Sequence, residues 1–134
     1  MQKNLNHLAV WVSIACVGMV LLFLHPTLAQ AGSSFAGRWT GQYVNSVGDR
    51  GDDTLVLEED RDGRLRGTWT GNIEVFGRRI DENTAELHGR TQTREYRITL
   101  RRHHDGLTLH YVARRLDAPG EYKGESHFTR DRFR

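Results

Sequence analysis

The sequence predicts a small all-β protein, an antiparallel meander barrel of about six to eight strands that follows an N-terminal signal segment. No stretch after residue 31 keeps a helical apolar period. Short segments with alternating apolar and polar residues occur instead. Clusters of Gly, Asp and Asn separate them at spacings of about 8–12 residues, which is typical of sandwiches and barrels.

The N-terminal segment has the pattern of an export signal. Lys3 gives it a positive start, Leu8–Leu24 form an apolar run, and Ala29-Gln30-Ala31 is a small-x-small cleavage pattern. We expect a signal peptide over residues 1–31, a single β-barrel domain over residues 32–134, and a secreted or periplasmic location. The alternative is an uncleaved membrane anchor, because the 17-residue run reaches the lower limit of a membrane span.

The expected strands follow one another in chain order. Alternation places Phe35, Trp39 and Tyr43 on one face of a first strand over residues 35–43. Further alternating segments cover residues 55–57, 65–71, 73–80, 84–90, 96–100, 107–113 and 122–128. We expect the inward-facing residues to form one core: Phe35, Trp39, Tyr43, Leu55, Leu57, Leu65, Trp69, Tyr96, Ile98, Leu100, Leu109, Tyr111, Tyr122 and Phe128.

Two hairpins have a register that the sequence itself predicts. A three-residue loop with Gly63 in the left-handed conformation sets Leu57 opposite Gly67 and Leu55 opposite Trp69. On the other face, Glu58 then meets Arg66, an opposite-charge pair.

The second hairpin turns at residues 103–106. A symmetric register there pairs Leu100 with Leu109 and Ile98 with Tyr111. It also pairs Tyr96 with Ala113 on the inside, and Glu95 with Arg114 on the outside.

A Gly-x-Trp-x-Gly pattern occurs twice, at residues 37–41 and 67–71. Glycine weakens a strand, so its recurrence beside Trp indicates a steric need. One interpretation is that each indole lies flat over a backbone that only glycine permits. The other is that the small inward residues leave room for a ligand beside the ring.

Phe35-x-Gly37-x-Trp39 resembles the Gly-x-Trp start of lipocalin-like and avidin-like (calycin-type) meander barrels. Residues 62–69 are similar to the second-to-third-strand hairpin of avidins. The resemblance implies a cup that is closed at one end and holds a small apolar or mixed ligand. Avidins have several further tryptophans around biotin, whereas this chain has none after Trp69. Biotin is therefore not the expected ligand.

The leading functional prediction is an exported, non-catalytic protein that binds a small ligand. Gly-flanked and neighbouring aromatic residues on the inner face are the expected ligand-binding residues: Trp39, Tyr43, Trp69, Tyr111 and Tyr122.

The alternative prediction is a surface-recognition or inhibitor module that binds an anionic partner. Residues 88–115 contain seven arginines against Glu95 and Asp105. Arginine binds phosphate and carboxylate through two parallel hydrogen bonds, so an anionic glycan or a lipid head group would suit such a face. The candidate anion-binding residues are Arg97, Arg101, Arg102 and Arg114.

Other functional classes have little support. The net charge of +2 and the absence of aromatic residues interleaved with the arginines disfavour nucleic acid as a partner. No nucleophile-elbow or phosphate-loop motif occurs, so we expect no enzyme and no cofactor. His88, His110 and His127 have outward parity, so no metal site is expected. The acidic residues of segment 49–62 are interpreted as turn residues rather than calcium ligands.

Overall fold

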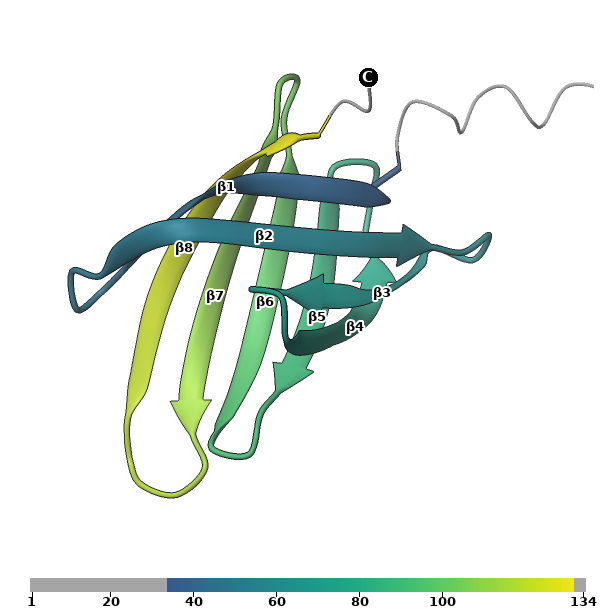
Figure 1. Ribbon diagram of the computed structural model, residues 1–134. Helices are drawn as coiled ribbons and strands as arrows, with labels where there is room; N and C mark the ends of the chain where they lie inside the picture. The colour runs from purple at the N-terminus through teal and green to yellow at the C-terminus, as the bar shows by residue number, and fades with distance from the viewer. Residues whose placement is uncertain (1–33, 132–134) are drawn as a thin grey trace, which may run out of the picture. The chain divides into compact units, whose positions relative to one another are not determined.

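A computed structural model describes residues 34–131, and all eight of its elements are strands (Figure 1). The expected signal segment, residues 1–31, lies outside the described residues. The strands are β1 (Gly37–Asn45), β2 (Arg50–Glu59), β3 (Arg64–Trp69), β4 (Ile73–Arg79), β5 (Thr84–Arg90), β6 (Arg94–Arg102), β7 (Leu107–Arg115) and β8 (Glu121–Arg130).

The strands form one closed antiparallel barrel in which each strand pairs with the next and β8 pairs with β1. This confirms the predicted fold class. In Figure 1, β1 and β2 run across the front at a steep angle to β5–β8 behind them. Such a crossing follows from the strand tilt and twist that closure of a barrel requires.

Both predicted hairpin registers are confirmed. Leu57 pairs with Gly67 and Glu58 with Arg66 across β2 and β3, and Gly63 has a φ of 77°. Across β6 and β7, Ile98 pairs with Tyr111. Glu95 also pairs with Arg114 in that hairpin, and the carboxylate accepts a hydrogen bond of 2.6 Å from the guanidinium.

Glycines at the strand contacts let neighbouring backbones come close. A Cβ on Gly41 of β1 would overlap the carbonyl oxygen of His127 in β8, and one on Gly67 would overlap the carbonyl oxygen of Val56 in β2. Close approach of the adjacent strand therefore explains Gly41 and Gly67 of the Gly-x-Trp-x-Gly pattern, whereas Gly37 and Gly71 have positive φ angles of 132° and 85°.

The end of the β1–β8 seam is held by side chains. Asp131, just after β8, accepts a hydrogen bond of 2.8 Å from the Thr40 hydroxyl. Its other oxygen lies 3.1 Å from Nε of Arg38, so the residue after β8 is held against the start of β1.

The core fills the barrel towards one end. Twelve of the fourteen expected core residues are buried, and the other two, Tyr43 and Tyr122, are half-buried. Ile73, Val75, Ala85, Leu87, Leu107 and Ala113 also belong to the core.

Phe35 is the core residue that fills this end of the barrel, and it is fully buried. Arg79 and Arg102 lie over its ring, with guanidinium carbons 4.9 and 5.7 Å from the ring centroid. Glu59 accepts hydrogen bonds from the Phe35 amide at 2.9 Å and from Nε of Arg79 at 2.7 Å. We call this end, with Phe35 and the β2–β3, β4–β5 and β6–β7 turns, the closed end.

Across residues 34–131, no helix is long and apolar enough to cross a membrane.

Candidate ligand-binding cavity

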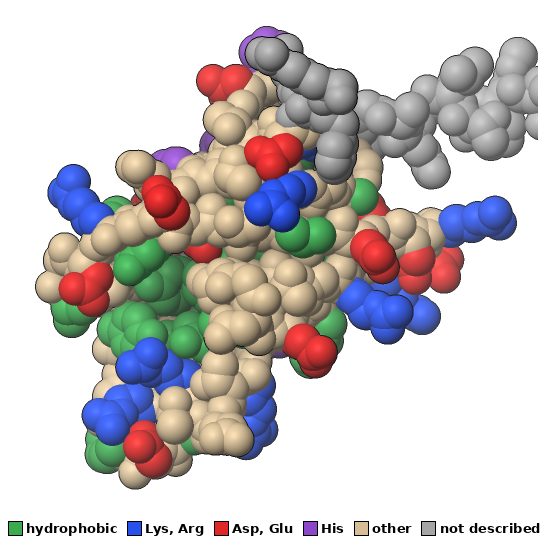
Figure 2. Space-filling model, in the orientation of Figure 1, with side chains coloured by type: hydrophobic (Ala, Val, Ile, Leu, Met, Phe, Trp, Pro, Cys, Tyr) green, Lys and Arg blue, Asp and Glu red, His purple; other side chains and the backbone are tan. Residues whose placement is uncertain are grey.

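A cavity of about 530 Å³ lies at the opposite end of the barrel from Phe35. The β1–β2, β3–β4, β5–β6 and β7–β8 turns surround this end, which we call the open end. Figure 2 shows apolar side chains gathered beneath β2, bordered by basic and acidic side chains. Five aromatic residues from five strands line the cavity: Tyr43, Trp69, Tyr96, Tyr111 and Tyr122.

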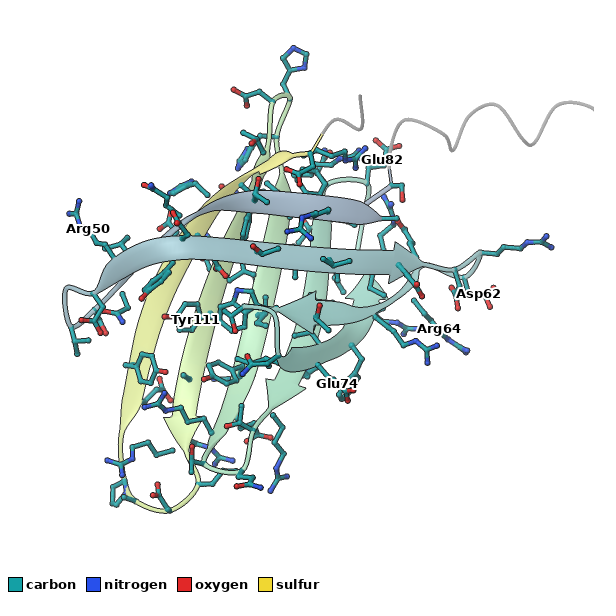
Figure 3. All side chains as sticks on the ribbon, viewed as in Figure 1. Arg50, Asp62, Arg64, Glu74, Glu82 and Tyr111 are labelled. Atoms are coloured by element: carbon teal, nitrogen blue, oxygen red, sulfur yellow. The ribbon has the colours of Figure 1, made fainter. Side chains whose placement is uncertain are left out.

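The aromatic rings stand at steep angles to one another. The centroids of Trp69 and Tyr96 are 5.3 Å apart with an interplanar angle of 89°. Tyr111 lies 4.9 Å from Trp69, and it meets Tyr122 edge to face at 6.0 Å. In Figure 3, Tyr111 lies below β2, beside β7 and β8. These edge-to-face contacts are favourable. They hold the rings at different angles around the cavity.

Two glycines provide the space that the tyrosine rings occupy. A Cβ on Gly124 of β8 would overlap the ring of its cross-strand partner Tyr111. A Cβ on Gly51 of β2 would lie 2.8 Å from the ring of its partner Tyr43. Because glycine has no side chain, each ring can lie across the neighbouring strand.

Asp53 is a buried carboxylate in the cavity lining, with 4% of its surface exposed. Its Oδ2 accepts hydrogen bonds from Nε1 of Trp69 at 2.8 Å and from the Ser126 hydroxyl at 2.6 Å. Its Oδ1 accepts a hydrogen bond of 2.9 Å from the Thr54 amide. Burial raises the pKa of Asp53, and the three hydrogen bonds offset only part of that effect.

The phenols of Tyr111 and Tyr122 stay protonated at neutral pH. Burial and a hydrogen bond with Tyr96 raise the pKa of Tyr122 to about 12. Burial also raises the pKa of Tyr111. Their hydroxyl groups can therefore donate hydrogen bonds to a bound molecule.

Arg94 is the basic residue in the cavity lining. Its guanidinium carbon lies 5.2 Å from the centroid of the Tyr122 ring, within the range of a cation–π contact. A hydrogen bond with Tyr96 and the nearby Tyr122 raise the pKa of Arg94.

Four of the five expected ligand-binding residues meet at this cavity: Tyr43, Trp69, Tyr111 and Tyr122. Trp39 does not line it and is removed from the candidate site. Its indole Nε1 donates a hydrogen bond of 2.9 Å to the Phe35 carbonyl, and Arg130 lies over its ring. Trp39 and Tyr43 share a face of β1, but Trp39 stands towards the closed end.

The four candidate anion-binding arginines do not form one cluster. Arg97 and Arg101 are exposed on β6, whereas Arg114 on β7 is paired with Glu95. Arg102 lies at the closed end, where it donates hydrogen bonds to the Ser34 and Glu82 carbonyls at 3.3 and 3.4 Å. Burial, together with the nearby Arg79 and Arg130, lowers its pKa. The predicted arginine face is thus divided between the outer wall and the closed end.

Sequence reasoning missed Asp53, Arg94 and Tyr96 as cavity residues. The sequence predicts a turn position for Asp53, but this residue lies inside β2 and is buried. Its parity with Leu55 and Leu57 was the signal that could have identified it. The sequence predicts Tyr96 as a core residue, where it also belongs, and the parity of Arg94 with Tyr96 and Ile98 is the signal that could have identified it.

The described residues contain no group of three or more His, Cys, Asp or Glu side chains that could hold a metal ion. His88, His110 and His127 are exposed on the outer wall, as their parity predicts.

No protein-family model matches the chain, and no curated protein matches it. Similarity to solved structures is limited to the fold. The barrel EF1p2_mFAP2b, solved bound to DFHBI, superposes with a TM-score of 0.53 at 9% identity, covering 72% of this chain and 93% of that one. A protein of unknown function from the DUF3598 family of Nostoc punctiforme superposes with a TM-score of 0.55 at 12% identity, covering 72% of this chain and 47% of that one. At these identities, the chain shares a β-barrel architecture with both proteins.

Proposed function

We propose that this protein is an exported, non-catalytic binding protein whose barrel takes a small apolar or mixed ligand at its open end. The observation that carries the proposal is the cavity of about 530 Å³ with five aromatic walls. Its volume lies within the range of about 300–1,000 Å³ that small-molecule sites occupy. Aromatic walls with a few placed polar groups are typical of such sites.

Two further observations support this proposal. The cup shape, closed at the Phe35 end and open at the other, agrees with what the resemblance to lipocalin-like and avidin-like barrels implies. A barrel of similar architecture was solved bound to DFHBI. The proposed location, secreted or periplasmic, depends on the signal pattern of residues 1–31.

Native and denaturing mass spectrometry on the gently purified protein test the proposal. We expect an extra mass in the native spectrum that denaturation releases. Tyr122→Ala removes one cavity wall and should lose that mass. The matched control is Phe76→Ala, because the Phe76 side chain is 61% exposed and does not line the cavity. Retention of the extra mass by Tyr122→Ala and its loss by Phe76→Ala would contradict the proposed site.

If the native spectrum shows no extra mass, a second measurement decides whether the proposal is abandoned. Trp69 lines the cavity, so its emission should change when a small molecule enters. A screen of small apolar and mixed compounds should find ligands that change this emission in a Trp39→Phe background. If no compound does so, the proposed function is wrong.

The arginine alternative remains a separate proposal with its own test. Arg97 lines two grooves on the outer wall, together with His88 and Val112. Binding of an anionic glycan or lipid head group there should weaken strongly with added salt and with Arg97→Glu. Binding that is insensitive to both would exclude it.

A further inference from the structure

Asp53 has hydrogen-bond partners but no counter-ion among them. The groups that donate to its carboxylate are the indole of Trp69, the hydroxyl of Ser126 and the backbone amide of Thr54, and all three are uncharged. A buried carboxylate is costly unless it is neutralised by a proton or by a cation. Since Asp53 belongs to the cavity lining, a bound molecule can supply that cation.

The walls around Asp53 also favour a cation. The faces of aromatic rings carry negative electrostatic potential and attract ammonium and guanidinium groups, most strongly where water is excluded. Trp69, Tyr96 and Tyr111 stand at angles of 60–89° to one another, so ring faces and edges border the cavity from several directions. The guanidinium of Arg94 already lies over Tyr122.

The charged side chains at the open end also favour a cation. Asp49 and Asp52 join Asp53 in the lining, against the single guanidinium of Arg94. The lining therefore carries more acidic than basic side chains. Such a mouth attracts cations and disfavours anions.

We propose that the ligand of this cavity is an organic cation, a protonated amine or a quaternary ammonium on an apolar body, whose charged group lies beside Asp53 and among the aromatic rings. This inference rests on the proposed function and specifies its ligand class. The apolar body fills the space between the rings, and Arg94 competes with the ligand for the negative potential of the cavity.

Three probes of similar shape and different charge test the ligand class. They are benzyltrimethylammonium, its uncharged carbon isostere neopentylbenzene, and the anion benzylphosphonate, each titrated into the full protein by calorimetry. We expect the cation to bind at least about tenfold more tightly than the isostere, since a desolvated cation–π contact and a carboxylate both favour it. The anion should bind more weakly than either.

Two variants locate the charge selectivity. Asp53→Asn keeps an oxygen that can accept the Trp69 and Ser126 hydrogen bonds, and it should weaken binding of the cation about tenfold more than binding of the isostere. Its matched control is Asp105→Asn, an identical charge change in the exposed turn after β6. Circular dichroism and tryptophan emission check that each variant is folded.

Arg94→Gln tests the preference for a cation without removing a buried side chain. Loss of the resident guanidinium should tighten binding of the cation several-fold, because the repulsion and the competition for Tyr122 both disappear. Arg61→Gln, an exposed arginine in the β2–β3 turn, is the control.

The outcomes separate this inference from the proposed function. Preferred binding of the isostere or the anion would overturn the organic-cation proposal, while the cavity would stand as a ligand site. Tighter cation binding in Asp53→Asn, or weaker cation binding in Arg94→Gln, would overturn it as well. If none of the three probes binds, the organic-cation proposal fails, and the emission screen then decides whether the cavity binds other molecules.

Discussion

Asp53 is a carboxylate placed inside a barrel, and its environment links the charge of one residue to the stability of the whole domain. Its folded-state pKa is raised by burial. The folded protein therefore binds the carboxyl proton of Asp53 more tightly than the unfolded chain does. The stabilisation that comes from this tighter proton binding is fully present below the ordinary carboxyl pKa of about 3.9. It is lost as the pH rises through the raised pKa of Asp53.

Asp53→Asn should remove this contribution, because an amide does not titrate in this range. We expect the unfolding free energy of wild type minus that of Asp53→Asn to fall as the pH rises from about 3 to about 7. Urea unfolding at a series of pH values measures the difference. Asp105→Asn, exposed in a turn, should show no such trend. A difference that increases with pH would contradict the assignment.

Gly41 illustrates a second effect at the residue scale, which is steric. Any Cβ at this position would overlap the backbone carbonyl of His127 on β8. The neighbouring strand cannot move away without breaking the seam that closes the barrel.

Gly41→Ala should therefore destabilise the protein by about 3 kcal/mol, as is typical of strained overpacking. Gly51→Ala is the matched control, because its Cβ would meet the Tyr43 ring at 2.8 Å and that ring can move. We expect Gly51→Ala to lower the unfolding free energy by less than Gly41→Ala does. Chemical denaturation measures both, and equal costs would contradict the steric explanation.

At the scale of elements, the segment before β1 closes one end of the barrel. Glu59, at the end of β2, holds the Phe35 amide and pairs with Arg79 of β4 at 2.7 Å. The Ser34 hydroxyl donates a hydrogen bond of 3.0 Å to the same carboxylate. A few residues outside any strand are therefore tied to two strands of the barrel.

Phe35→Ala should destabilise the protein by about 3–5 kcal/mol, since it removes a fully buried ring from the closed end. Phe76→Ala, the same change at an exposed ring of β4, should cost less than about 0.5 kcal/mol. Thermal or urea unfolding compares the two variants. Equal costs would mean that Phe35 does not fill the end of the barrel.

At the scale of the whole molecule, closure decides what the barrel exposes. Pairing of β8 with β1 leaves no free sheet edge among the eight described strands. Closure removes the unpaired backbone groups that promote edge-to-edge association. It also brings residues of β1–β4 and β6–β8 together in the lining of the cavity.

Amide hydrogen exchange tests this closure directly. The amides of β1 and β8 that face each other should exchange as slowly as those between β6 and β7. In an open sheet, the outward amides of both terminal strands would exchange much faster. Fast exchange confined to β1 and β8 would therefore contradict the closed barrel.

Local pairing explains why much of this fold could be predicted. Strand alternation depends on the geometry of each residue, so the faces of β2, β3, β6 and β7 followed from the positions of the apolar residues. The registers of Leu57 with Gly67 and of Ile98 with Tyr111 followed from short turns that leave little choice of pairing. The half-buried tyrosines of the cavity were predicted through the same parity.

By itself, the sequence determined which residues face inward and which strands form hairpins, because both depend on contacts that are close along the chain. The tertiary structure decided how far along the barrel each inward residue lies. Trp39 and Tyr43 share a face, yet one lies towards the closed end and the other lines the cavity. It also brought Ser126 to Asp53 across the seam of the barrel, 73 positions apart in the chain. A period of two residues specifies a face but no distance along the barrel axis, and a contact between β2 and β8, which are far apart in the chain, leaves no trace in local spacing.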